Sequence, residues 1–289
     1  MKIMKLLGML VLAVLLIAGC SSPGTTSVTF SLTDAPVDTS TIAHVYAQFG
    51  GLSVNESASA SAPESSWISV PIDTTKVYDL LALSGGLSDL LGTVPLTAGT
   101  QVNQIRFTSP VLTVVEAANP TTQLPCTLNS SSLKIVKAFA IPLTGTLSLT
   151  VDFDARKSLV TSATGYKMTP VLRAVVDNEA GKILGSFATA GVTNPASDSY
   201  MVYAYKTGTY TSAEALPNAE GTYFANAITA ALPKSDGIGG YTYTLAFLEA
   251  GTYDLVVFDT TAATVADATS YVGVSVLSAK ETTLNIALP

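Results

Sequence analysis

Leu147-Ser148-Leu149-Thr150-Val151-Asp152-Phe153 decides the fold class of the chain, because an apolar side chain occupies every second position. Successive side chains of a β-strand point to opposite faces, so this period of two predicts a strand with one buried face. The same alternation occurs at residues 28–32, 241–247 and 284–288, and clusters of turn-forming residues separate the segments. Many short strands at such spacing predict an all-β protein built from sandwiches or barrels.

One segment departs from this pattern. Its apolar side chains have helical spacing, interrupted by two glycines at 85 and 86: Val77, Leu80, Leu81, Leu87, Leu90 and Leu91. A helix repeats its apolar face every three to four residues. We therefore expect one or two short helices in the first domain, crossing one end of a sandwich.

The first twenty residues have the features of an export signal. Lys2 and Lys5 precede an apolar run over residues 6–18, and this run is shorter than the ~20 residues that a transmembrane helix needs. The run ends in Leu16-Ile17-Ala18-Gly19-Cys20, which resembles a bacterial lipobox, where the cysteine is lipidated and the chain is cleaved before it. We expect a signal peptide over residues 1–19 and a lipid on Cys20, whose acyl chains, such as palmitate, anchor the protein in a membrane.

The residues after Cys20 predict where the anchor lies. Ser21 follows the cysteine, and its resemblance to lipoprotein sorting signals favours the outer membrane of the bacterial cell envelope. Residues 20–26 are small and polar, as in a flexible tether.

Composition divides the remaining chain and excludes some functions. Nine of the 12 tyrosines lie from Tyr200 onward, and residues 177–182 have the polarity of a hinge. We expect two β-sandwich domains of the immunoglobulin or transthyretin type, over residues 27–180 and 183–289. With 14 Lys and Arg against 21 Asp and Glu, nucleic acid is not an expected partner. One His and two Cys leave little from which to build a zinc or iron–sulfur site.

The first predicted domain resembles a known family. Residues 28–36 (Val-Thr-Phe-Ser-Leu-Thr-Asp-Ala-Pro) are similar to the opening of a bacterial and archaeal lipoprotein family catalogued as domain of unknown function 4382, and so are residues 78–81, 104–106, 152–160 and 168–175. The resemblance covers about residues 27–180. It implies a fold and a location but no activity, so no catalytic residue is implied.

The second predicted domain has a looser resemblance. Tyr243-Thr244-Leu245 and Gly251-Thr252-Tyr253 are similar to segments of carboxypeptidase-regulatory or transthyretin-like sandwiches. This resemblance implies another β-sandwich.

Four aspartates form a candidate calcium site. Asp152 and Asp154 lie on the polar face of one predicted strand, and Asp34 and Asp38 flank the turn after the first strand. If the two segments are neighbours, four carboxylates can bind Ca²⁺, which takes six to eight oxygen ligands.

The same aspartates have a structural alternative. Asp34 can close its own turn, and Asp154 can pair with Arg156, Lys157 or Arg173. The neighbouring basic residues also argue against a glycosidase pair, because they lower the pKa of a carboxyl that catalysis needs raised.

Other candidate residues favour structural roles. His44 is expected to face solvent on a strand, since the chain has no Gly-x-Ser-x-Gly motif to complete a hydrolase triad. Cys126 has no thiol partner once Cys20 is lipidated, and we expect it to be buried. Trp67 is expected in the core. The late tyrosines fit half-buried strand positions, while exposed rings among them could stack on sugars or on a protein.

We therefore predict a membrane-anchored envelope lipoprotein that is a non-catalytic binding or assembly module. Its candidate partners are another envelope protein or a surface polysaccharide. The alternative is a calcium-dependent adhesin or glycan-binding surface protein, with Asp34, Asp38, Asp152 and Asp154 as metal ligands; no other cofactor is expected. An enzyme ranks third.

Overall fold

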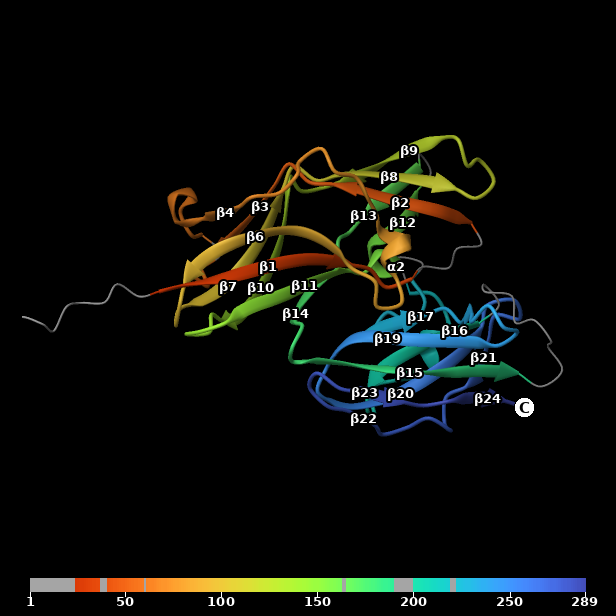
Figure 1. Cartoon of the computed structure of the whole chain (residues 1–289). Coiled ribbons are helices and arrows are strands. Elements are labelled where there is room, and N and C mark those ends of the chain that lie inside the picture. The colour runs from red at the N-terminus through yellow and green to blue at the C-terminus, as the bar shows by residue number, and fades with distance from the viewer. Residues whose placement is uncertain (1–23, 37–40, 60, 163–164, 190–199, 219–221) are drawn as a thin grey trace, which may run out of the picture.

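Strands dominate the chain, which confirms the all-β prediction (Figure 1). The computed structural model describes residues 24–36, 41–59, 61–162, 165–189, 200–218 and 222–289. The predicted signal peptide, Cys20 and Asp38 lie outside these ranges. Strand β1 (Thr25–Thr33) begins inside the expected tether, since Thr25 and Thr26 pair with the strand over residues 89–97. Thr26 is buried, and its hydroxyl donates to the Pro142 carbonyl at 2.7 Å.

Within the described residues, the N-terminal half (residues 25–176) contains three sheets. The first has the order β14 (Leu172–Val176), β11 (Thr146–Phe153), β1, β6 (Asp89–Thr97). The second has the order β10 (Ser132–Ala140), β7 (Gln101–Thr108), β3 (Gly51–Asn55), β4 (Ile68–Val70). The third has the order β12 (Leu159–Ser162), β13 (Gly165–Met168), β9 (Gln123–Leu128), β8 (Val111–Glu116), β2 (Ile42–Gln48), β5 (Tyr78–Asp79).

The described part of the C-terminal half (residues 180–288) contains two sheets. One has the order β18 (Lys234–Ser235), β19 (Tyr241–Glu249), β15 (Ala180–Thr189), β23 (Glu281–Thr283), with β24 (Ile286–Leu288) also on β15. The other has the order β17 (Thr229–Ala231), β16 (Tyr200–Lys206), β20 (Gly251–Asp259), β21 (Thr264–Asp267), with β22 (Val274–Val276) also on β20.

The alternation in the sequence places the core of the N-terminal half. Leu147, Leu149, Val151 and Phe153 of β11 are buried and pack in one cluster with alternate residues of β1. Strands β1 and β11 pair in parallel, with Thr33 opposite Asp152, so the ends of the two strands meet at one edge of the sheet. This edge faces the C-terminal half.

Strands β16 and β20 bury both faces. One face packs against the other sheet, and the opposite face carries a second cluster that includes Tyr203, Phe224 and Phe258. This explains why their sequences are nearly continuous apolar runs. It also explains why Tyr203 and Tyr205 are buried rather than displayed.

The helical spacing at residues 77–91 produces one short helical turn. The 3₁₀-helix η3 covers Leu80–Leu83, and Leu90 and Leu91 belong to β6, where Leu91 is buried and Leu90 is exposed. The α-helix α2 (Ala155–Ser158) lies elsewhere, directly after β11. The other 3₁₀-helices of the described residues are η2 (Glu64–Ser66) and η4 (Ser212–Ala215). Pairing of β6 with β1 overrides the local helical pattern.

The chain passes between the halves in a short turn over residues 177–179, between β14 and β15. The sequence predicted the polar hinge at residues 177–182, and the last three of these residues already belong to β15. Figure 1 shows α2 and the loop around η3 lying where the two halves meet.

Gly185 lets two segments of backbone cross closely. The Leu284 N–H donates to the Leu184 carbonyl at 2.8 Å, and the Ser186 N–H donates to Asn285 Oδ1 at 3.0 Å, so the chain between β23 and β24 lies against Gly185. A Cβ on residue 185 would overlap the Leu284 carbonyl.

We therefore predict that Gly185→Ala destabilises the protein by about 1–3 kcal/mol, the usual cost of overpacking. Urea unfolding measures this change. Gly24→Ala is the control, because a Cβ at Gly24 meets nothing within 4 Å. Equal unfolding free energies for the two variants would contradict the close approach.

Candidate functional site

Three buried aspartates meet where β1 and β11 end. Asp34 follows β1, Asp152 lies in β11, and Asp154 is the N-cap of α2. Each is at most 5% exposed. The parallel pairing of β1 with β11 brings them together, as the sequence-based calcium hypothesis required for Asp34, Asp152 and Asp154.

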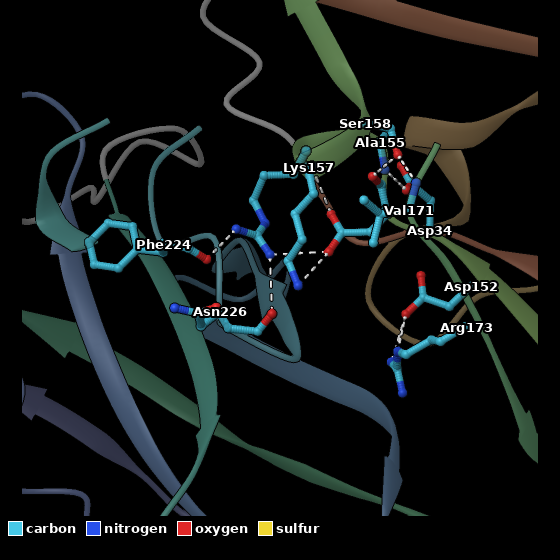
Figure 2. Close-up of polar contacts among 12 residues, drawn as sticks. Asp34, Asp152, Ala155, Lys157, Ser158, Val171, Arg173, Phe224 and Asn226 are labelled. Carbon is cyan, nitrogen blue, oxygen red and sulfur yellow. Dashed lines mark hydrogen bonds and ion pairs between the residues drawn. The ribbon is translucent and has the colours of Figure 1, made fainter. Parts of the chain in front are cut away.

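Basic residues pair with two of these carboxylates. Asp154 Oδ2 lies 3.1 Å from Arg156 Nη2 and 3.4 Å from Lys157 Nζ, and its Oδ1 accepts from the Lys157 N–H at 3.1 Å. Arg173 lies opposite Asp152 in the sheet register, and its Nε donates to Asp152 Oδ2 at 2.8 Å. Figure 2 shows these contacts. They agree with the structural alternative for the aspartates.

The same guanidinium groups reach across to the C-terminal half. Arg156 Nη1 donates to the carbonyls of Phe224 at 2.8 Å and Tyr223 at 3.1 Å. Arg173 Nη1 donates to the Phe247 carbonyl at 2.7 Å. Each guanidinium therefore links a carboxylate of one half to backbone carbonyls of the other.

Two of the carbonyls that accept these bonds belong to residues with an unusual backbone conformation. Phe224 and Phe247 have φ values of 50° and 54°, in the left-handed region that residues with a Cβ seldom adopt. Such conformations persist where the surroundings hold them. Two arginines are part of those surroundings: Arg156 donates to the Phe224 carbonyl (Figure 2), and Arg173 donates to the Phe247 carbonyl.

Asp34 has no cationic partner among the described residues. Its Oδ1 accepts from the Ala155 N–H at 2.8 Å, whereas Asp34 Oδ2 and Asp152 Oδ1 have no hydrogen-bond partner in the described part of the chain. Both residues line a cavity of about 10 Å³ at the junction, which is room for about one water molecule. Burial raises the pKa of Asp34 well above its ordinary value; the Ala155 N–H opposes this, and the charges of Asp152 and Asp154 add to it.

The calcium hypothesis stays a prediction. Among the described residues, no group of three or more His, Cys, Asp or Glu side chains is placed to hold a metal ion. Asp38 lies outside those residues. An oxygen of Asp152 and one of Asp154 are already bound to arginine.

The single histidine faces solvent, as expected. His44 Nδ1 lies 2.7 Å from Asp79 Oδ2, and the His44 ring stacks on Tyr46 at 5.3 Å. The His44 side chain is 43% exposed.

Cys126 and Trp67 were both expected to be buried, and the structure confirms this for Cys126 alone. Cys126 is buried as expected, and burial raises its pKa to about 11, so the thiol is protonated at neutral pH.

The core prediction for Trp67 is wrong. Its half-buried ring lies under the Arg106 guanidinium at 4.0 Å and near Lys134 at 5.4 Å. A cation attracted to the ring face holds it on a sheet surface instead.

A larger cleft opens beside Arg156, between the two halves. Its volume is about 290 Å³. The residues that line it are Ile42, Ala155, Arg156, Leu159, Tyr203, Thr222, Tyr223, Phe258, Thr260 and Ala263. We name this the junction cleft. The cluster of tyrosines in the sequence had indicated Tyr203 and Tyr223 as candidate binding residues. Phe258 and Leu159 could not be recognised as cleft residues from the sequence, because they stand in apolar patterns typical of a core.

The chain is thus an all-β protein whose two halves are joined through buried arginine–carboxylate pairs. It belongs to the family described as "Domain of unknown function (DUF4382)", which matches residues 25–170. A comparison with curated proteins gave no match.

Several solved structures are distantly similar to this chain. A leucine-rich repeat protein from Bacteroides thetaiotaomicron is 12% identical with a TM-score of 0.23; the match covers 92% of this chain and 26% of that one. CBMbc (family CBM26) from Eubacterium rectale Amy13K, in complex with maltoheptaose, is 12% identical, with 90% and 92% covered and a TM-score of 0.21. The fimbrial anchor protein Mfa2 from Porphyromonas gingivalis is 14% identical, with 86% and 83% covered and a TM-score of 0.20. Likenesses this weak support no inference about function.

Asp34→Asn is predicted to stabilise the protein at neutral pH. Because the pKa of Asp34 is raised in the folded state, folded Asp34 keeps its proton at pH values where unfolded Asp34 has lost it. The stability of the wild type is therefore highest below pH 3.8 and falls as pH rises toward the pKa of folded Asp34. Asparagine removes this loss and still accepts from Ala155. Thermal melts from pH 4 to pH 8 should show a gain of a few degrees that grows with pH.

Asp254→Asn is the control for Asp34→Asn. Burial raises the pKa of Asp254, but hydrogen bonds from the Gly208 N–H, the Gly273 N–H and the Thr207 side chain together lower it more, so its net shift is downward. Its substitution should destabilise the protein at neutral pH. Parallel pH profiles for the two variants would contradict the assignment at Asp34.

Arg156→Ala is predicted to cost about 3–5 kcal/mol of unfolding free energy, because it leaves Asp154 and the Phe224 carbonyl buried without their main partner. Urea denaturation measures the loss. Lys182→Ala is the control: its ion pair with Glu281 lies at the surface and should contribute less than about 1 kcal/mol. Similar losses for both would refute the role of the buried pair.

Proposed function

We propose that the protein is a lipid-anchored lipoprotein of the bacterial outer membrane that acts as a non-catalytic binding module. In this proposal Cys20 carries the lipid after cleavage of residues 1–19. Two β-sandwich domains, over residues 27–180 and 183–289, then form the exported part of the protein. The C-terminal domain is of the carboxypeptidase-regulatory or transthyretin type.

One observation supports the binding role. The buried charged groups at the junction join the two halves, and an open cleft lined by aromatic side chains lies beside them. Asp154 and Asp152 are buried and paired with Arg156 and Arg173, which supports a structural role for these two carboxylates. A concave site with aromatic walls and few polar groups is typical of ligand binding.

The anchor rests on the sequence of residues 1–20. Among the residues that the structure describes, no helix is long and apolar enough to cross a membrane. Acyl chains on Cys20 would hold the protein at the membrane, since each buried methylene contributes about 0.8 kcal/mol.

We propose two classes of partner, another envelope protein and a surface polysaccharide. Either class could bind at the junction cleft, where both halves contribute side chains.

Replacing Cys20 tests the anchor. The full chain, expressed in a Gram-negative host with labelled palmitate, should carry the label and sediment with the outer membrane. Cys20→Ala should lose both properties, while Cys126→Ala, which removes the other thiol, should keep them. Label and membrane association that survive Cys20→Ala would overturn the proposed anchor.

A gentle detergent pull-down from the native envelope tests the binding role. A stoichiometric protein or polysaccharide should co-purify with the lipidated chain. Recovery of the chain alone would contradict an assembly role.

A further inference from the structure

We infer that the junction cleft binds one sugar unit of a neutral polysaccharide. This inference deepens the proposed function, because it names the ligand class at the site that the proposal uses. It stands on three observations: the charge of the cleft, the exposed aromatic ring that lines it, and the hydroxyl groups in its lining.

The charge that lines the cleft is neutralised by a neighbouring residue. Arg156 is the one charged side chain among the described residues that line it, and Asp154 lies 3.1 Å away. The whole chain carries a formal charge of −7, which repels acidic polymers. Both features favour a ligand without charge.

The rim of the cleft presents an aromatic ring. Tyr223 is 41% exposed, and its ring lies 6.2 Å from that of Phe258, which is buried in the wall. A pyranose ring has C–H faces that pack on aromatic rings and hydroxyls around its edge that form hydrogen bonds. A volume of about 290 Å³ is at the small end for a ligand site, as expected for one sugar unit of a longer chain.

Polar side chains complete the lining of the cleft. The Nη atoms of Arg156 are bound to Asp154 and to C-terminal carbonyls. Thr222 and Tyr223, which also line the cleft, carry hydroxyl groups. Because a hydroxyl both donates and accepts hydrogen bonds, these groups suit the hydroxyls of a sugar better than a purely apolar ligand.

The test is a glycan array probed with the full lipidated chain in detergent, followed by calorimetry on the glycans that bind. The array carries neutral oligosaccharides of glucose, galactose, mannose and N-acetylglucosamine beside uronate-containing and sulfated ones. We expect binding to at least one neutral glycan. Tyr223→Ala should weaken it roughly two- to twelvefold, and Tyr223→Phe should leave it within about twofold, since it keeps the ring.

Tyr46→Ala is the matched control, because Tyr46 is also partly exposed but lies on β2 beside His44 and does not line the cleft. Its affinity should equal that of the wild type. Melting temperatures of all variants show whether each is folded; Tyr223 is exposed enough for its loss to be tolerated.

Three results would overturn the inference: binding to acidic glycans alone, no binding to any glycan, or equal affinity for Tyr223→Ala and wild type. The inference and the proposed function can fail separately. A protein partner in the pull-down with an empty array refutes the sugar site and leaves the binding module intact. Loss of the membrane anchor refutes the lipoprotein and leaves the array result unaffected.

Discussion

The structure depends on how two buried carboxylates are neutralised. A carboxylate taken out of water is costly unless a cation and hydrogen bonds compensate it, and Asp152 and Asp154 are almost fully buried. Arginine meets this need and has donors to spare, because its guanidinium carries five N–H groups in a fixed plane. The spare donors of Arg156 and Arg173 bind carbonyls of the C-terminal half. Neutralising charge within one half therefore also fixes the other half, and it shapes the wall of the cleft between them.

Periodicity predicted the strands well but could not show what would cover their polar faces. The alternation in β11 predicted a strand with Asp152 on its polar side, and both the strand and the pairing with Arg173 are present. Yet Thr150 and Asp152 are buried, and Arg173, the partner of Asp152, bonds to the C-terminal half, which lies at this end of the strand. A sequence pattern records which residues are apolar. It does not record that a polar face lies at the junction with another part of the same chain.

Pairing between distant segments accounts for the other differences. Leu90 and Leu91 have helical spacing, but hydrogen bonds to β1 hold them in a strand. Trp67 was expected in the core, and the cation of Arg106, on β7 of the same sheet, holds its ring on the sheet surface instead. The tyrosines of β16 proved to be core because an extra cluster covers the second face of that strand. In each case the deciding contact comes from residues far away in sequence, where local pattern has no information.

The position of β1 has a mechanical consequence for a chain held at its N-terminus. Tension applied from that side enters the described structure at Gly24 and Thr25 and pulls along β1, which is bonded to β11 on one edge and to β6 on the other. A pull along a central strand loads its ladder bonds in shear, so many must break together rather than one after another. The load would pass to β11 and then through Asp152 and Asp154 to the arginines. A ligand held in the cleft would thus be connected to the anchor by two strands that resist sliding.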